Sequence, residues 1–523
     1  MTRIKPASLI LAVALALGLL WDLLFYAKPL GISALLFVLL LTAALVGIAH
    51  RQGVLPAWRN LWLLAPLLFC AAMVFVRANP FLTFLNVAAG LALLGLLAHF
   101  YAAGWLGRTG LIEYPLLLLQ VGGNALVRAA PLVSASVDLT AAREQGRRSL
   151  LPVARGCLLA LPVLLVFTCL LASADLIFAK YLEDIWQIDF LADLLEWFWR
   201  GILVLVVAWL AAGGQAYALG RAGAPDDKGA LVKAIDSLGG AIRIGFVEVA
   251  ILLASVDLLF TLFVWIQFVY LFGGQANIGV EGYTYAEYAR RGFFELVAVS
   301  LLTLGMILSL HQVGRRETGR QKLVFNALSS LMVALVLVML ASAFKRLLLY
   351  EAAYGYTQLR LYSHVFMAWL AFAFAWFLIT LWLQPDGLTS RTGDPEPRTG
   401  DPVPRMGYPV PRMGHFPLGA FVAALGFVIT LNLVNPDAFI ARQNLARYQA
   451  IGKLDVYYLA QLSDDAVPTL IQNVDRLASA DRQVLNENLG SRLEHMQNIT
   501  QWRRWPSFHL SRQRAYRLLV ERK

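Results

Sequence analysis

Apolar segments of about twenty residues recur along this chain of 523 residues and restrict its fold more than any other feature. A helix needs about 20 mainly apolar residues to cross a bilayer. Because a backbone in lipid must satisfy its own hydrogen bonds, such segments fold as helices. We therefore predict an all-α, polytopic transmembrane helix bundle with about 11 spans. The segments are 7–26, 30–49, 60–77, 81–103, 151–173, 199–219, 243–271, 292–312, 323–344, 364–384 and 416–434.

The composition agrees with a lipid environment. Hydrophobic residues make up 59% of the chain and charged residues 15%, whereas soluble domains carry about 25% charged residues. The net charge of +11 does not indicate nucleic acid, because the basic residues punctuate apolar stretches instead of forming one patch. The three cysteines also lie apart in apolar stretches, which argues against disulfides and a zinc site. We expect the lipid bilayer as a partner, and neither a metal nor a cofactor.

The segment 111–133 is apolar but differs from the spans. It contains Pro115, Gly122 and Pro131, so we predict an interfacial or re-entrant cytoplasmic piece over 111–150. The rest of the chain divides into five further parts. These are a four-span N-terminal region (1–110), a six-span repeat region (151–384), a Pro-rich cytoplasmic loop (385–415), the last span (416–434) and a helical extracytoplasmic domain (435–523).

The distribution of Lys and Arg predicts the orientation. Most of them fall in connections on the same side as the N-terminus. Because Lys and Arg in short loops favour the cytoplasmic side, the N-terminus is predicted inside and the C-terminal domain outside. In that domain, Asp464 is a plausible cap for a helix that has Pro468 near its first turn.

One phrase occurs twice inside apolar segments. LLASADLIF at 170–178 recurs as LLASVDLLF at 252–260, and a degenerate copy, LASA, lies at 340–343. The copies fall in spans that run in the same direction. We interpret them as internal parallel two-helix repeats, at roughly 144–220, 235–314 and 318–384, with coincidence among common residues as the alternative.

The repeated phrase supplies two acidic candidates, Asp175 and Asp257. A carboxylate inside a bilayer is costly and often functional, so the functional interpretation of the pair is an ion- or proton-binding site facing the bundle. The structural alternative is a cap or a hydrogen bond to a neighbouring helix. Asp257 is the deeper copy and the stronger functional candidate. Glu248 and His364 are further candidates within or beside spans.

A basic and aromatic cluster precedes the eighth span. Tyr283, Tyr288, Arg290 and Arg291 lie on the predicted outer side, where the charge rule does not favour arginine. Such a cluster is suited to lipid headgroups, phosphates or a carboxylate. The alternative is a local ion pair between Arg291 and Glu295, four residues later on one helix face.

Several stretches resemble a known family. They include YAEYARRGFFEL at 285–296, NPDAFIAR at 435–442 and DDAVP at 464–468. Together they resemble a bacterial polytopic membrane-protein family classed as a domain of unknown function, over roughly 150–500. The resemblance implies the bacterial plasma (inner) membrane. It implies no catalytic residues.

Two functions remain open from the sequence. The leading hypothesis is a non-enzymatic membrane protein, either a transporter-like bundle or a sensor or scaffold whose outer domain binds a protein partner. The alternative is a glycosyltransferase-like enzyme acting on a lipid-linked substrate at the outer face. Enzymes of that layout usually carry an acidic pair in the first outer loop, and here only Asp22 lies near it.

Overall fold

The computed structural model describes residues 7–136, 189–221, 244–271, 293–383 and 415–522, together with positions 167, 171 and 175. Within these ranges the chain is helical, and the only bridge between extended residues is an isolated parallel one. Eleven of the described helical stretches are long enough and apolar enough to cross a membrane. The predicted fold class, an all-α polytopic helix bundle, is confirmed.

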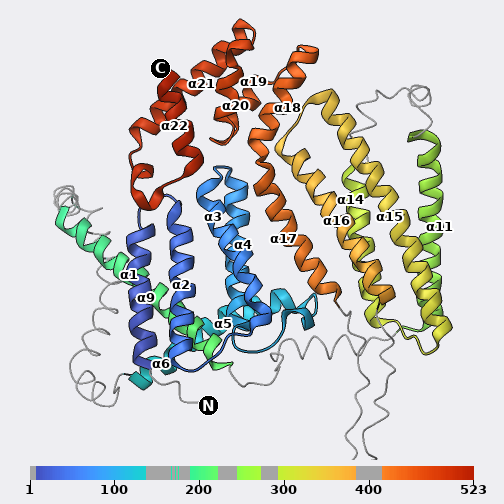
Figure 1. Cartoon of the computed structure of the whole chain (residues 1–523), viewed down its shortest axis with the longest axis horizontal. Coiled ribbons are helices and arrows are strands. Elements are labelled where there is room, and N and C mark those ends of the chain that lie inside the picture. The colour runs from blue at the N-terminus through green and yellow to red at the C-terminus, as the bar shows by residue number, and fades with distance from the viewer. Residues whose placement is uncertain are drawn as a thin grey trace, which may run out of the picture.

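Four antiparallel helices form the N-terminal part of the bundle (Figure 1). They are α1 (Ala7–Phe25), α2 (Ile32–Arg51), α3 (Leu64–Val76), which continues the 3₁₀ turn Trp58–Leu63, and α4 (Pro80–Phe100). The start of α4 is well defined, because the side chain of Asn79 accepts the Leu82 backbone N–H over 3.1 Å. Pro80 at the first helical position has no N–H that would need a partner. These helices coincide with the first four predicted spans.

Three further helices pack against this group. They are α5 (Glu113–Val127), α6 (Ala129–Ser136) and α9 (Asp189–Gly220). In Figure 1, α5 and α6 lie at the end of the bundle that holds the N-terminus, and α9 runs obliquely past α1 and α2. By length and composition Glu113–Ala135 also qualifies as a span, so the interfacial assignment of 111–150 stays a prediction. The predicted span 151–173 lies outside the described residues, apart from two single positions.

A second group of helices carries its own apolar core. Its members are α11 (Phe246–Leu271), α14 (Phe293–Val313), α15 (Gly319–Tyr354) and α16 (Gln358–Leu383). The long α15 begins with a capping box, in which the Thr318 hydroxyl accepts the Gln321 N–H and the Gln321 side chain accepts the Thr318 N–H, each over 3.2 Å. A parallel bridge between Ile244 and Gly314 joins the segments before α11 and α15, which run in the same direction. The threefold repeat stays a prediction, because most of its first unit lies outside the described residues.

The last membrane-length helix, α17 (Phe416–Val434), leads directly into the C-terminal helical unit. At the junction Asn435 has a left-handed φ of 54°, and Pro436 begins the next helix. Asparagine tolerates this conformation better than most residues, and proline disfavours a helical residue before it. The unit comprises α18 (Pro436–Ile451), α19 (Val456–Gln461), α20 (Val467–Asn473), α21 (Ser479–Asn498), α22 (Leu510–Arg522) and the 3₁₀ turns Val474–Arg476, Gln501–Arg503 and Trp505–Ser507.

The predicted cap at Asp464 is wrong. The residue before α20 is Ala466, and it makes no side-chain cap. Asp464 instead pairs with two arginines of later helices, Arg492 at 3.3 Å and Arg512 at 3.4 Å. Its carboxylate therefore joins the turn before α20 to α21 and α22, a tertiary role that local sequence cannot reveal.

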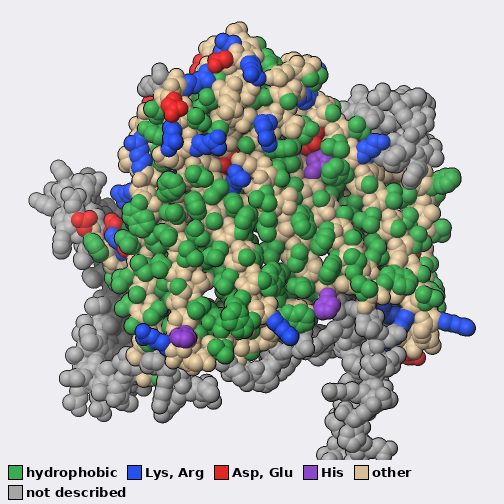
Figure 2. Space-filling model, in the orientation of Figure 1, with side chains coloured by type: hydrophobic (Ala, Val, Ile, Leu, Met, Phe, Trp, Pro, Cys, Tyr) green, Lys and Arg blue, Asp and Glu red, His purple; other side chains and the backbone are tan. Residues whose placement is uncertain are grey.

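The surface agrees with a membrane location. Figure 2 shows a broad hydrophobic band across the helices, with Lys and Arg side chains gathered on the C-terminal unit and at the opposite edge. The N-terminus and the C-terminal unit lie at opposite ends of the bundle (Figure 1). Which end faces the cytoplasm stays a prediction. The predicted Pro-rich loop lies almost wholly outside the described residues.

Candidate functional site

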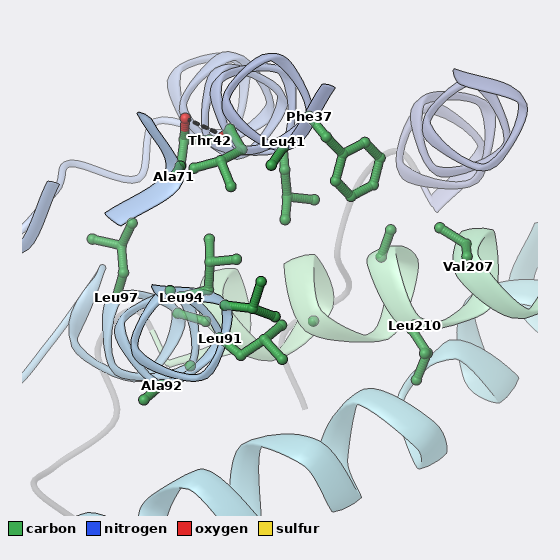
Figure 3. Close-up of a pocket in the computed structure, with 18 of the residues that line it drawn as sticks. Phe37, Leu41, Thr42, Ala71, Leu91, Ala92, Leu94, Leu97, Val207 and Leu210 are labelled. Atoms are coloured by element: carbon green, nitrogen blue, oxygen red, sulfur yellow. Dashed lines mark hydrogen bonds between the residues drawn. The ribbon is translucent and has the colours of Figure 1, made fainter. Parts of the chain in front are cut away.

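A cavity of about 960 Å³ opens between α2, α4 and α9. Figure 3 shows its apolar lining, with Phe37 and Leu41 from α2, Leu91 and Leu94 from α4, and Leu210 from α9. The volume is near the upper end of the range for small-molecule sites, about 300–1,000 Å³. The arrangement therefore leaves an apolar cavity of substantial size among the membrane-length helices.

Glycines explain why the helices leave this space. A Cβ on Gly18 would collide with the Val204 carbonyl oxygen, and one on Gly213 would collide with the Ala125 carbonyl oxygen. Two glycines thus let α9 pack closely on α1 and α5. On the cavity side the opposite holds, because a Cβ on Gly90 or Gly214 would meet no atom within 4 Å.

The polar side chains of the lining differ in their partners. Thr42 donates to the Val38 carbonyl over 2.8 Å, and Asn86 exchanges hydrogen bonds with Asn432. Lys28 hydrogen-bonds to the Leu23 carbonyl. Gln215 stands apart, since it is 3% exposed and neither its amide nitrogen nor its amide oxygen has a partner. Its amide is therefore available to a polar group of a ligand.

Asp257, the leading candidate from the sequence, does not line this cavity. It lies near the middle of α11 and is 3% exposed. Leu253 and Phe260 are buried on the same helix face, one turn away on either side. Both carboxylate oxygens lack a hydrogen-bond partner. The structure thus confirms neither an ion site nor the capping alternative at Asp257.

The other acidic candidates occupy separate places. Asp175 is one of the singly described positions and is exposed, and its backbone N–H donates to the Leu171 carbonyl over 3.0 Å. Glu248 accepts the Gly245 backbone N–H over 2.8 Å, which stabilises the start of α11. Glu295 is exposed in the first turn of α14. None of these three carboxylates lines the cavity between α2, α4 and α9.

Four residues of the predicted outer cluster, Tyr283, Tyr288, Arg290 and Arg291, lie outside the described residues. The hypothesis that they hold headgroups therefore stays a prediction, as does the pair of Arg291 with Glu295.

His364 lies in a buried polar pair. Its Nε2 is 3.0 Å from Glu351 Oε2, and the Phe344 ring contacts its imidazole edge-on with centroids 4.3 Å apart. Glu351 is 1% exposed. The pair joins α15 to α16 near the end of the bundle that carries the C-terminal unit. This contact gives His364 a structural role, as a hydrogen-bonded residue between two helices.

Asp22 also has a structural partner. Arg200 forms two hydrogen bonds to its carboxylate, over 3.1 Å and 2.6 Å, and links α1 to α9. The guanidinium carbon lies 4.8 Å from the centroid of the Tyr26 ring. Asp22, the one acidic residue near the first outer loop where the glycosyltransferase-like alternative expects a pair, is therefore engaged in helix packing.

A buried polar network between the bundle and the C-terminal unit was not predicted. It centres on Asp437 and Asp465, which are 0% and 5% exposed. Asp437 accepts hydrogen bonds from Asn79 and Gln358 side chains, and Asp465 accepts the Asn79 backbone N–H over 3.2 Å. Burial raises the pKa of the Asp465 carboxyl above its ordinary value, an effect that the Ser511 hydroxyl partly offsets. Both aspartates belong to motifs quoted for the family resemblance, which was the available signal.

No group of three or more His, Cys, Asp or Glu side chains that could hold a metal ion occurs in the part of the chain that the structure describes. No curated protein and no solved structure matches the chain. The family model described as "Domain of unknown function (DUF4153)" matches residues 64–392 and 407–473, which is most of the chain. The family expected from the motifs is thereby confirmed, and the chain belongs to the DUF4153 family of unknown function.

Proposed function

We propose that this multi-pass membrane protein binds the hydrocarbon chain of a lipid, or of a lipid-linked molecule, in the cavity between α2, α4 and α9. The observation that carries the proposal is the cavity itself, with its volume of about 960 Å³ and its almost wholly apolar lining. On α2 the lining runs from Ala34 to Leu45, which at 1.5 Å per residue is about 17 Å. One leaflet supplies roughly half of the ~30 Å hydrocarbon core, so the length suits a single acyl chain.

The lining supports binding or transfer of an apolar cargo rather than ion-coupled transport through Asp257. That carboxyl lies on α11, in the second group of helices, and does not contribute to the lining. No carboxylate occurs among the described residues around the cavity. A transporter-like or scaffold protein remains the proposed class, with a lipid chain as its ligand.

Two glycines allow a direct test. Leucine at Gly90 or Gly214 would project into open space, because a Cβ there meets no atom within 4 Å. Both glycines lie within helices, where replacement of glycine favours the helix by up to about 1 kcal/mol. The variants Gly90→Leu and Gly214→Leu should therefore fold and fill part of the cavity.

The measurement is the amount of lipid retained per protein molecule, by mass spectrometry of the intact protein released from mild detergent. We expect the wild type to retain lipid and the two variants to retain much less. Gly47→Leu is the matched control, since Gly47 lies on α2, faces open space and is not in the lining. Equal retention by the wild type and both cavity variants would refute the proposal.

A further inference from the structure

Two arginines converge on one buried tyrosine at the end of the bundle that holds the N-terminus. Arg128 lies between α5 and α6, and Arg221 directly follows α9. Their guanidinium carbons lie 5.0 Å and 5.9 Å from the centroid of the Tyr217 ring. Tyr217 is 1% exposed, and its hydroxyl is 2.7 Å from Nδ1 of the buried His99.

The positive charge of this cluster is not balanced by the described residues around it. Arg128 donates through Nε to the Asn124 side-chain oxygen over 2.9 Å, which is a neutral partner. Arg221 is 8% exposed, and its guanidinium hydrogen-bonds to the Tyr217 hydroxyl, a neutral partner, while its Nε has no partner. Neither arginine forms an ion pair with a described carboxylate. Contact with an aromatic face offsets only part of the cost of burying a guanidinium.

Orientation in the membrane does not by itself account for this arrangement. Arginines that set topology need only lie on the cytoplasmic side, and exposed side chains such as Arg59 meet that need. Burial of Arg221 against Tyr217 is an additional feature with an energetic cost. An anion with several acceptor oxygens would satisfy the free donors, and phosphate matches the fork of N–H groups on arginine.

The cluster adjoins the cavity. Ala125, three residues before Arg128, belongs to the cavity lining. Gln215, six residues before Arg221, belongs to it as well. We propose that Arg128 and Arg221 bind a phosphate group at this end of the cavity, with the unpartnered Gln215 amide facing the same ligand. The inference rests on the proposed function, because a lipid whose phosphate binds these arginines would place its hydrocarbon chain in the cavity.

The test compares three probes on the full chain in detergent. They are phosphatidic acid, diacylglycerol with the same chains, and inorganic phosphate, each titrated against the midpoint of thermal unfolding. The variants are Arg128→Gln and Arg221→Gln, and Arg59→Gln is the control. We expect phosphatidic acid to stabilise the wild type, and the concentration for half of this effect to rise about tenfold in either variant, which corresponds to about 1.4 kcal/mol. Arg59→Gln should match the wild type.

The probes separate the sources of phosphate. Stabilisation by inorganic phosphate alone, lost in Arg221→Gln, would assign the site to a free anion, and stabilisation by phosphatidic acid alone would assign it to a lipid. Unchanged phosphatidic acid binding in both arginine variants would overturn the proposal. Arg221→Lys guards against misfolding, because it keeps the charge and loses the bidentate fork, and should show intermediate affinity.

The two proposals fail in different ways. If Gly90→Leu and Gly214→Leu bind diacylglycerol as the wild type does, the cavity proposal fails while the phosphate site stands on the arginine variants. If the arginine variants bind phosphatidic acid normally but the glycine variants do not, the cavity stands and the phosphate site fails.

Discussion

The side-chain amide of Asn79 donates to both carboxylate oxygens of Asp437, each over 3.1 Å. Asn79 precedes α4 in the membrane-spanning group, and Asp437 lies in the first turn of α18 in the C-terminal unit. Gln358 at the start of α16 and the Ser463 backbone N–H donate to the same carboxylate, over 2.6 Å and 3.1 Å. A single buried carboxylate therefore joins both helix groups to the C-terminal unit, aided by the positive end of the α18 dipole.

Replacement of Asp437 by alanine should destabilise this junction. Loss of the carboxylate leaves the buried Asn79 amide and the half-buried Gln358 amide unsatisfied, which costs about 3 kcal/mol. We expect a lower midpoint of thermal unfolding in detergent and faster proteolysis of the C-terminal unit. Asp475→Ala is the matched control, because its pair with Arg522 is exposed and worth about 1 kcal/mol at most. An unchanged midpoint for Asp437→Ala would show that the network does not hold the units together.

The stability of the same junction should depend on His509. Its Nε2 donates to the Arg77 carbonyl over 3.2 Å, and its Nδ1 lies 3.4 Å from the Arg512 backbone nitrogen. Burial, and secondarily the charge of Arg512, lower the pKa of His509 from 6.5 to about 4. Because the folded state binds this proton less readily than the unfolded state, stability is full above pH 6.5 and falls as the pH drops towards 4. At about 1.4 kcal/mol per unit of pKa, the loss by pH 4 is roughly 3 kcal/mol.

The variant His509→Gln isolates this contribution. Glutamine can donate to the Arg77 carbonyl but cannot take up a proton in this range. We expect a flatter pH dependence of the unfolding midpoint between pH 6.5 and 4 than in the wild type. Asp465 acts in the opposite direction, since a raised carboxyl pKa adds stability as the pH falls through it. Identical pH profiles for the wild type and His509→Gln would contradict the assignment.

A reciprocal amide pair inside the bundle offers a double-variant test. Asn86 on α4 and Asn432 on α17 donate to each other's side-chain oxygens over 2.9 Å and 2.8 Å. Removal of one partner strands the other in an apolar region, whereas removal of both is close to neutral. We expect Asn86→Leu and Asn432→Leu each to destabilise by about 1–2 kcal/mol.

The double variant should recover most of that loss in the unfolding midpoint, because no amide then lacks a partner. Additive losses in the double variant would mean that each asparagine has an independent role. For Asn432 such a role would be its additional bond to the Val428 carbonyl, over 2.9 Å.

Helix positions were predictable from the sequence because hydrophobicity and length determine which segments enter lipid. The site was not predictable in the same way. The cavity depends on where α9 crosses α2 and α4. That crossing depends on close contacts at Gly18 and Gly213, which cannot be predicted from the hydrophobic pattern of the sequence. Charge patterns indicated Arg128 and Arg221 only as cytoplasmic residues. Their convergence on Tyr217 is a tertiary contact between segments far apart in the chain.

The repeated phrase illustrates the limit of local similarity. Ser255 of α11 is exposed, whereas the matching Ser342 of α15 is 3% exposed. Two positions later the burial is reversed, with Asp257 buried and the matching Phe344 at 37% exposure. Leu253 and the matching Leu340 are both buried, so the two copies share one inward position and differ at the serine and aspartate positions. Similarity to the α15 copy alone therefore did not predict the environment of Asp257.

Asp257 gives the last prediction. Its carboxyl is buried in an apolar setting and neither oxygen has a hydrogen-bond partner, an arrangement that costs about 1–3 kcal/mol. We expect Asp257→Leu to raise the midpoint of thermal unfolding in detergent, because it replaces an unpaired polar group by a side chain suited to Leu253 and Phe260. Asp257→Asn should give no such gain, since it keeps an unpaired polar group in place.

A second measurement separates packing from function at the same residue. If Asp257 has no role in lipid binding, both variants should retain lipid in the α2, α4 and α9 cavity as the wild type does. A destabilised Asp257→Leu protein, or loss of an ion-coupled flux in proteoliposomes containing Asp257→Asn, would instead show that the carboxyl serves a bound ion. Either result would support the ion-binding hypothesis for Asp257 on α11. Acidic residues inside membrane helices are costly and usually functional.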